Sequence, residues 1–139
     1  MLKEIELPTN LELEPLHDPT RVSGFISPAE DYKSLRLHIA QRIVTDPVNT
    51  HYFQTDNNEM HYFGIYKDSI IVVDRSVEIK VSKIIVCNFN GEWLIRKLCK
   101  RDKAYYLCIN DNMEGCIPVA SGKVDYFGVV TWACLPFTS

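Results

Sequence analysis

The chain has 139 residues and a mass of 16.0 kDa, which suits a single domain, and 46% apolar residues against 24% charged ones allow a sizeable core. The formal net charge of −3 is not that of a protein that binds nucleic acid through an overall positive charge. The longest apolar runs, such as residues 129–135, are too short to cross a bilayer, and the N-terminus does not read as a secretory signal. We therefore expect a cytoplasmic protein with no membrane contact and no direct nucleic-acid site.

The first third of the chain divides into an arm and the start of a folded domain. Residues 1–32 contain four prolines and several acidic residues without clear periodicity, which favours an extended arm. Residues 33–139 are predicted to form the folded domain. Apolar residues between Ser34 and Thr45 recur at helical spacing and predict one short helix, which Asp46-Pro47 ends.

The rest of the domain is rich in β-branched and aromatic residues, which favour strands. Asn90-Gly91 stands between two such runs and is a strong hairpin signal, and Arg101-Asp102-Lys103 reads as a second hairpin turn. The pattern predicts a small, mostly antiparallel β domain. The predicted strands are Thr50–Thr55, Ser69–Asp74, Lys83–Phe89, Glu92–Lys100, Ala104–Ile109 and Val124–Leu135.

Neither the cysteines nor the basic residues indicate a metal or cofactor site. The five cysteines include no C-x-x-C pair and no companion histidine spacing, so we expect reduced thiols packed as small hydrophobic groups. Five basic residues gather around the second hairpin turn, and we interpret them as a solvated strand end. The cysteines are Cys87, Cys99, Cys108, Cys116 and Cys134, and the basic residues are Arg96, Lys97, Lys100, Arg101 and Lys103.

Several segments resemble one known family. Residues 23–32, Ser-Gly-Phe-Ile-Ser-Pro-Ala-Glu-Asp-Tyr, resemble the self-cleavage region of the UmuD-type SOS mutagenesis proteins, which belong to the LexA-like S24 peptidases. Residues 67–74, 91–98 and 126–130 resemble three strands of the same proteins. The resemblance is colinear from about residue 15 to residue 135. It implies a mostly β, LexA/UmuD-like peptidase fold of antiparallel strands with one short helix and an extended N-terminal arm.

The resemblance also implies a reaction. In family members a serine in a Gly-Asp-Ser-Met segment attacks a peptide bond of the protein's own arm, and a lysine on a neighbouring strand takes the serine's proton. The equivalent bond in this chain joins Ser23 and Gly24.

Both catalytic positions hold other residues here. The segment aligned with Gly-Asp-Ser-Met reads Asn57-Asn58-Glu59-Met60, so Glu59 stands at the nucleophile position. The base position holds Arg96, whose guanidinium stays protonated and cannot accept a proton. Lys97 keeps an amine, but side-chain alternation points it to the opposite face of its strand. We hypothesise a bidentate ion pair between Glu59 and Arg96; the alternative is that both side chains are solvated.

The resemblance and the replaced pair together suggest a catalytically inactive protein rather than an enzyme. We expect a binding or regulatory subunit in the SOS response and translesion DNA synthesis, with a Y-family DNA polymerase subunit, the RecA filament or an active UmuD-like relative as candidate partners. The second account is a self-cleaving serine-type peptidase that recruits Thr55 or Lys97. The third is a phage- or plasmid-borne decoy of RecA or of a host repressor.

The resemblance further implies a homodimer. The closing segment Val124–Leu135 includes Trp132, and Phe137 lies just beyond it, so we take this segment as the candidate dimer face. The alternative is an ordinary sheet strand buried within its own domain.

Overall fold

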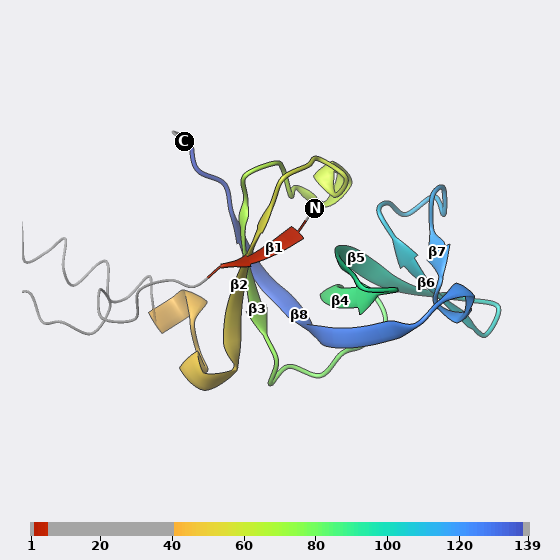
Figure 1. Cartoon of the computed structure of the whole chain (residues 1–139), viewed down its shortest axis with the longest axis horizontal. Coiled ribbons are helices and arrows are strands. Elements are labelled where there is room, and N and C mark those ends of the chain that lie inside the picture. The colour runs from red at the N-terminus through yellow and green to blue at the C-terminus, as the bar shows by residue number, and fades with distance from the viewer. Residues whose placement is uncertain (1, 6–40, 138–139) are drawn as a thin grey trace, which may run out of the picture.

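A computed structural model describes residues 2–5 and 41–137 of the chain. Its strands form a single sheet in the order β1-β2-β3-β8-β4-β5-β6-β7, and every pairing is antiparallel (Figure 1). The mostly β fold class is therefore confirmed. The strands are β1 (Leu2–Ile5), β2 (Thr50–Thr55), β3 (Ile70–Asp74), β4 (Ile84–Phe89), β5 (Glu92–Arg101), β6 (Ala104–Cys108), β7 (Ile117–Pro118) and β8 (Val124–Cys134), and the 3-10 helices are η1 (Pro47–Asn49), η2 (His61–Phe63) and η3 (Val119–Ser121).

The six strands expected from the sequence are present, each within one residue of its expected ends. Both hairpin turns are also confirmed. Asn90 and Gly91 have φ values of 51° and 88°, and Asp102 and Lys103 have 50° and 67°. Left-handed backbone at both central residues is the geometry of a two-residue turn whose twist matches its strands.

The structure describes only part of the predicted helix and only part of the predicted arm. Of the expected helix, residues 41–43 are helical, and the part before residue 41 lies outside the described residues. Of the expected arm over residues 1–32, Leu2–Ile5 forms β1, an edge strand paired with β2, and the remainder lies outside the described residues. The division into arm and domain remains a prediction.

β8 connects two parts of the sheet. Its first half pairs with β4, from Val124 to Val129, and its second half pairs with β3, from Val129 to Cys134. The strand therefore runs from one part of the molecule to the other (Figure 1). The buried apolar residues form two clusters. The first lies mainly among β1, β2 and β3 and includes Val86 of β4 and Ile95 of β5. The second lies among β4, β5, β6 and β8.

β5 contributes to both clusters through alternate residues. Ile95 is buried in the first cluster and Trp93 packs against it, whereas Leu94 and Leu98 are buried in the second. This confirms the expected alternation along the strand after the Asn90-Gly91 turn.

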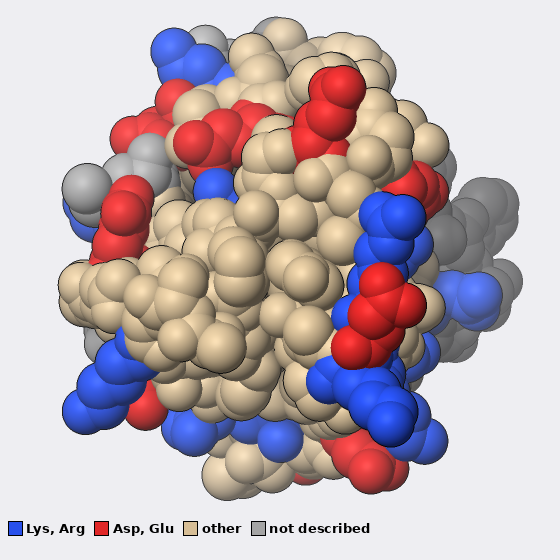
Figure 2. Space-filling view, turned by 90° about the vertical axis from the view of Figure 1, so that its right-hand side faces the viewer, with Lys and Arg blue, Asp and Glu red and all other residues tan. Residues whose placement is uncertain are grey.

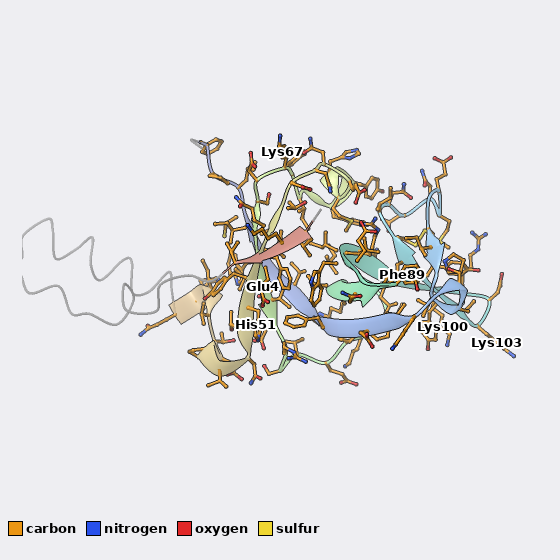
Figure 3. The ribbon with its side chains drawn as sticks, viewed as in Figure 1. Glu4, His51, Lys67, Phe89, Lys100 and Lys103 are labelled. Carbon is orange, nitrogen blue, oxygen red and sulfur yellow. A yellow bond between two sulfur atoms is a disulfide. The ribbon has the colours of Figure 1, made fainter. Side chains whose placement is uncertain are left out.

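The curled sheet brings its first strand close to β5. β1 aligns Leu2 with Thr55 of β2, and it also contacts β5. Glu4 of β1 lies beside His51 of β2, with Oε2 and Nδ1 3.1 Å apart (Figure 3). No helix among the described residues is long and apolar enough to cross a membrane.

Candidate functional site

A pocket of about 220 Å³ lies where β1, the loop after β2 and the first half of β5 meet. β6 pairs with β5 only from Lys97 onward, so the preceding residues of β5 have β4 on one side and the pocket on the other. The lining residues are Leu2, Thr55, Asn57, Glu59, Glu92, Trp93, Leu94, Ile95 and Arg96. The pocket thus contains both positions at which the resemblance places a catalytic pair.

Glu59 and Arg96 form an ion pair at this pocket. Arg96 Nη2 lies 3.2 Å from Glu59 Oε2, and the two side chains are 9% and 51% exposed. The hypothesised pairing is confirmed, and the alternative of two solvated side chains is wrong for Arg96. The expected bidentate form is not seen: Arg96 Nη1 donates instead to the carbonyl oxygen of Ile95 at 2.8 Å, and the buried Nε has no hydrogen-bond partner.

The loop after β2 places Glu59 at the pocket by local contacts. Met60 is almost fully buried, and its carbonyl oxygen accepts hydrogen bonds from the backbone N–H groups of Phe63 and Ile65. The backbone N–H of Glu59 donates to Asn57 Oδ1 at 3.0 Å. The buried Met60 side chain anchors the loop in the core. The neighbouring Glu59 side chain therefore lies at the surface, within reach of Arg96 on β5.

The two residues of the alternative catalytic account are not brought together at this pocket. Thr55 is buried and lines it, and its hydroxyl donates to the carbonyl oxygen of Asn57 at 3.4 Å. Lys97 is absent from the lining; its Nζ donates to Asp111 Oδ1 at 2.8 Å and lies 5.3 Å from the centre of the Phe63 ring.

The surroundings of Lys97 favour its protonated form, which is the wrong form for a base. The hydrogen bond to Asp111 raises the pKa of the Lys97 ammonium above its ordinary value, and burial acts in the opposite direction. A general base must be uncharged near neutral pH, which requires a lowered lysine pKa. The shift therefore works against proton abstraction by Lys97.

Cys87 is a thiol whose pKa is influenced by the charge of Arg96, yet its environment makes it unreactive. It is fully buried on β4. Burial raises the pKa of Cys87 to about 11, and the positive charge of Arg96 offsets only part of that effect. Because the thiolate is the reactive form, Cys87 is a core residue.

The expectation that all five cysteines are reduced is wrong for two of them. Cys108 and Cys116 form a disulfide, with their Cα atoms 4.4 Å apart. The cause is strand register: β6 and β7 pair Leu107 with Ile117, so the flanking residues 108 and 116 face each other at the distance of an antiparallel pair. Cys87, Cys99 and Cys134 are free.

The interpretation of the basic cluster as a solvated strand end holds for only part of it. Lys100 and Lys103 are exposed and lie at the outer end of the β5–β6 hairpin (Figure 3). Arg96 is buried, and Lys97 is half-buried and bound to Asp111. The reason is that β4 pairs with β5 only as far as Lys97, whereas the residues of β5 beyond it pair with β6 alone.

Ser23 and Gly24, the cleavage-site equivalents, lie outside the described residues. Among residues 2–5 and 41–137, no group of three or more His, Cys, Asp and Glu side chains is arranged to hold a metal ion.

Comparison with known proteins agrees with this fold. The model of the Peptidase S24-like family matches residues 22–131. Protein ImpA of Salmonella typhimurium is 25% identical over 119 residues, which is 86% of this chain and 81% of ImpA. Protein SamA of the same species is 26% identical over 117 residues, 84% of this chain and 81% of SamA, and protein MucA of Escherichia coli is 26% identical over 110 residues, 78% and 75%. The chain therefore belongs to the peptidase S24-like family, as a UmuD-type SOS mutagenesis protein.

Proposed function

We propose that this chain is a UmuD-type protein that does not cleave itself and acts in the cytoplasm as a binding or regulatory subunit of the SOS response and translesion DNA synthesis. The observation that supports this most directly is the contact between Arg96 and Glu59. If residues 59 and 96 are the nucleophile and base positions, as the resemblance implies, both are occupied by charged groups that bind each other.

The chemistry of the pair explains why cleavage is not expected. Peptide hydrolysis by a serine and a lysine needs a hydroxyl that loses its proton and an amine that is uncharged when it accepts it. A guanidinium stays protonated at any physiological pH, so Arg96 cannot act as that base. Glu59 is itself held by Arg96, which further removes it from any role as a nucleophile.

A chain that is not cut keeps its arm. The bond between Ser23 and Gly24 then remains intact, and the binding surface presented to partners is that of the full-length protein. We place a Y-family DNA polymerase subunit first among the candidate partners, ahead of the RecA filament and an active UmuD-like relative.

The binding role predicts a stable complex of the full-length chain with the catalytic subunit of a Y-family polymerase. Mixed at micromolar concentration, the two should sediment together faster than either alone. The experiment uses the uncut chain, with bovine serum albumin in its place as the control for non-specific association. Separate sedimentation of the two proteins would contradict the polymerase partnership.

The second half of β8 supports a homodimer. Within residues 2–5 and 41–137, the segment Thr131–Cys134 pairs with β3 on one side and with no strand on the other, and its residues are exposed. Trp132 is 39% exposed, and Leu135 and Phe137 are also exposed. An apolar strand edge of this kind favours pairing with another strand. We therefore propose that two copies associate through this part of β8.

Replacement of Trp132 tests the dimer directly. The unaltered chain should sediment as a dimer at micromolar concentration, and W132S should shift it toward monomer, because aromatic side chains dominate such contacts. Y105S is the matched control, since Tyr105 is similarly exposed but lies on β6. A monomeric unaltered chain would contradict the dimer, and a dimer of unchanged stability in W132S would contradict this face.

A further inference from the structure

Three sulfur atoms gather at the end of β6 and the start of β7. Met113 Sδ lies 3.9 Å from Cys108 Sγ and 3.8 Å from Cys116 Sγ. Cys108 is fully buried, whereas Met113 and Cys116 are half-buried. The thioether therefore covers the two cysteine sulfurs on the side that faces the loop, residues 109–116.

The loop is built to hold Met113 in this place. Met113 has a φ of 66°, a left-handed conformation that is uncommon for a residue with a side chain and persists where surrounding contacts impose it. Asn110 Oδ1 accepts from the backbone N–H of Asn112, and Asn112 Oδ1 accepts from that of Glu114. Asp111 ties the same loop to Lys97 of β5.

We propose that, once the disulfide is reduced, Cys108, Cys116 and Met113 form a binding site for a soft monovalent cation, Cu(I). Thiolate and thioether sulfurs are the ligands that Cu(I) prefers. Three sulfurs placed about 2.3 Å from one ion in a trigonal arrangement lie about 4 Å apart. The two distances from Met113 Sδ already match that spacing. After reduction, the one further change needed is that the two cysteine sulfurs move apart from bonding distance to the same spacing.

The ligand set favours Cu(I) over zinc. Structural zinc sites take four ligands from cysteine, histidine and carboxylate groups. The described residues offer no fourth ligand of that kind arranged with these cysteines. A thioether as the third ligand instead fits a soft ion that accepts three-coordinate geometry.

Uptake of the ion takes two steps, reduction of the disulfide and then binding of Cu(I). A cellular dithiol donates two electrons and two protons to the Cys108–Cys116 bond and becomes a disulfide, which leaves two thiols. Cu(I) then displaces one proton from each thiol to solvent, and Met113 adds its thioether without losing a proton. The resulting site carries one net negative charge; the Lys97–Asp111 ion pair lies nearby, since Lys97 stands opposite Cys108 in the β5–β6 register.

The site lies at the β6–β7 end of the molecule. Seen from this side, uncharged residues fill the middle of the face, and charged side chains lie mainly around its rim (Figure 2). Exposed Asn112 and Glu114 flank Met113 in the loop, so an ion can approach from solvent on the Met113 side. The inference does not depend on the proposed binding role of the protein.

The test is a Cu(I) titration of the full-length chain under anaerobic conditions, against a coloured Cu(I) chelator as competitor. The chain reduced with a phosphine and then desalted should bind one Cu(I), and the same chain in its disulfide form should not compete. X-ray absorption should show three sulfur neighbours at about 2.3 Å. M113L should weaken binding by about tenfold, or about 1.4 kcal/mol, and C116S should remove it.

The control is C134S, which removes an exposed thiol of β8 outside the cluster and should bind Cu(I) as the unaltered chain does. Circular dichroism confirms that each variant is folded. Equal binding by the reduced and disulfide forms would overturn the proposal without relying on any variant. So would unchanged affinity in M113L, or a spectrum with two sulfur neighbours.

Discussion

Incubated with activated RecA or at alkaline pH, the unaltered chain is expected to keep its full mass of 16.0 kDa. The double variant E59S/R96K, in contrast, is expected to be cut between Ser23 and Gly24 and to lose residues 1–23, about one sixth of its length. Intact-mass spectrometry distinguishes the two outcomes. The experiment tests at once whether cleavage is absent and whether residues 59 and 96 are the positions that abolish it.

The expected recovery has a physical basis in the burial of residue 96. Arg96 is 7% exposed, and a lysine at the same place would be desolvated, which lowers the pKa of its amine and leaves part of it uncharged. A serine at position 59 would supply the hydroxyl on the same side of the pocket. Both groups are then of the kinds that peptide hydrolysis by a serine–lysine pair requires.

The single variants are the matched controls for this experiment. E59S has a hydroxyl but keeps the protonated guanidinium, and R96K has an amine but keeps a carboxylate in place of the nucleophile, so both should remain whole. Loss of the first 23 residues from the unaltered chain would refute the proposed inactivity. A folded double variant that stays whole would refute the assignment of the two positions.

The strands were predictable from the sequence because their signals are local. The β2 segment Thr50–Thr55 is rich in β-branched and aromatic residues, and Asn90-Gly91 specifies a tight turn through two residues that tolerate left-handed backbone. β1 and β7 escaped prediction because Leu2–Ile5 and Ile117–Pro118 are short. Each becomes a strand only because a partner edge is already in place beside it.

The site was predictable in part. The resemblance singled out Glu59 and Arg96, and the structure brings them within ion-pair distance. The burial of Arg96 and the single-nitrogen contact could not be read from the sequence, since both depend on how the sheet curls and on the nearby carbonyl of Ile95. The Cys108–Cys116 pair was missed for a related reason: it is fixed by the register of β6 with the unpredicted β7.

Removal of Glu59 and removal of Arg96 are expected to lower the free energy of unfolding by different amounts. Removal of Glu59 in E59A leaves the Arg96 guanidinium buried without its counter-charge, whereas R96M leaves a carboxylate that is half exposed and stays solvated. Breaking a fully buried pair costs about 3–5 kcal/mol, but water reaches this pair through the pocket, so we expect E59A to cost about 1–3 kcal/mol. R96M should cost less than about 1 kcal/mol, because a well-packed apolar side chain needs no counter-charge.

Urea unfolding followed by circular dichroism measures these free energies, and the double variant E59A/R96M completes the cycle. In the double variant the cost of E59A should largely disappear, because no buried cation remains to be compensated. E92A is the control: Glu92 is an exposed acid that lines the same pocket, and its replacement should change stability by less than about 0.5 kcal/mol. If R96M proved more destabilising than E59A, Arg96 would be acting mainly as a packed and hydrogen-bonded element of β5, and the charge of Glu59 would not be what holds it in the pocket.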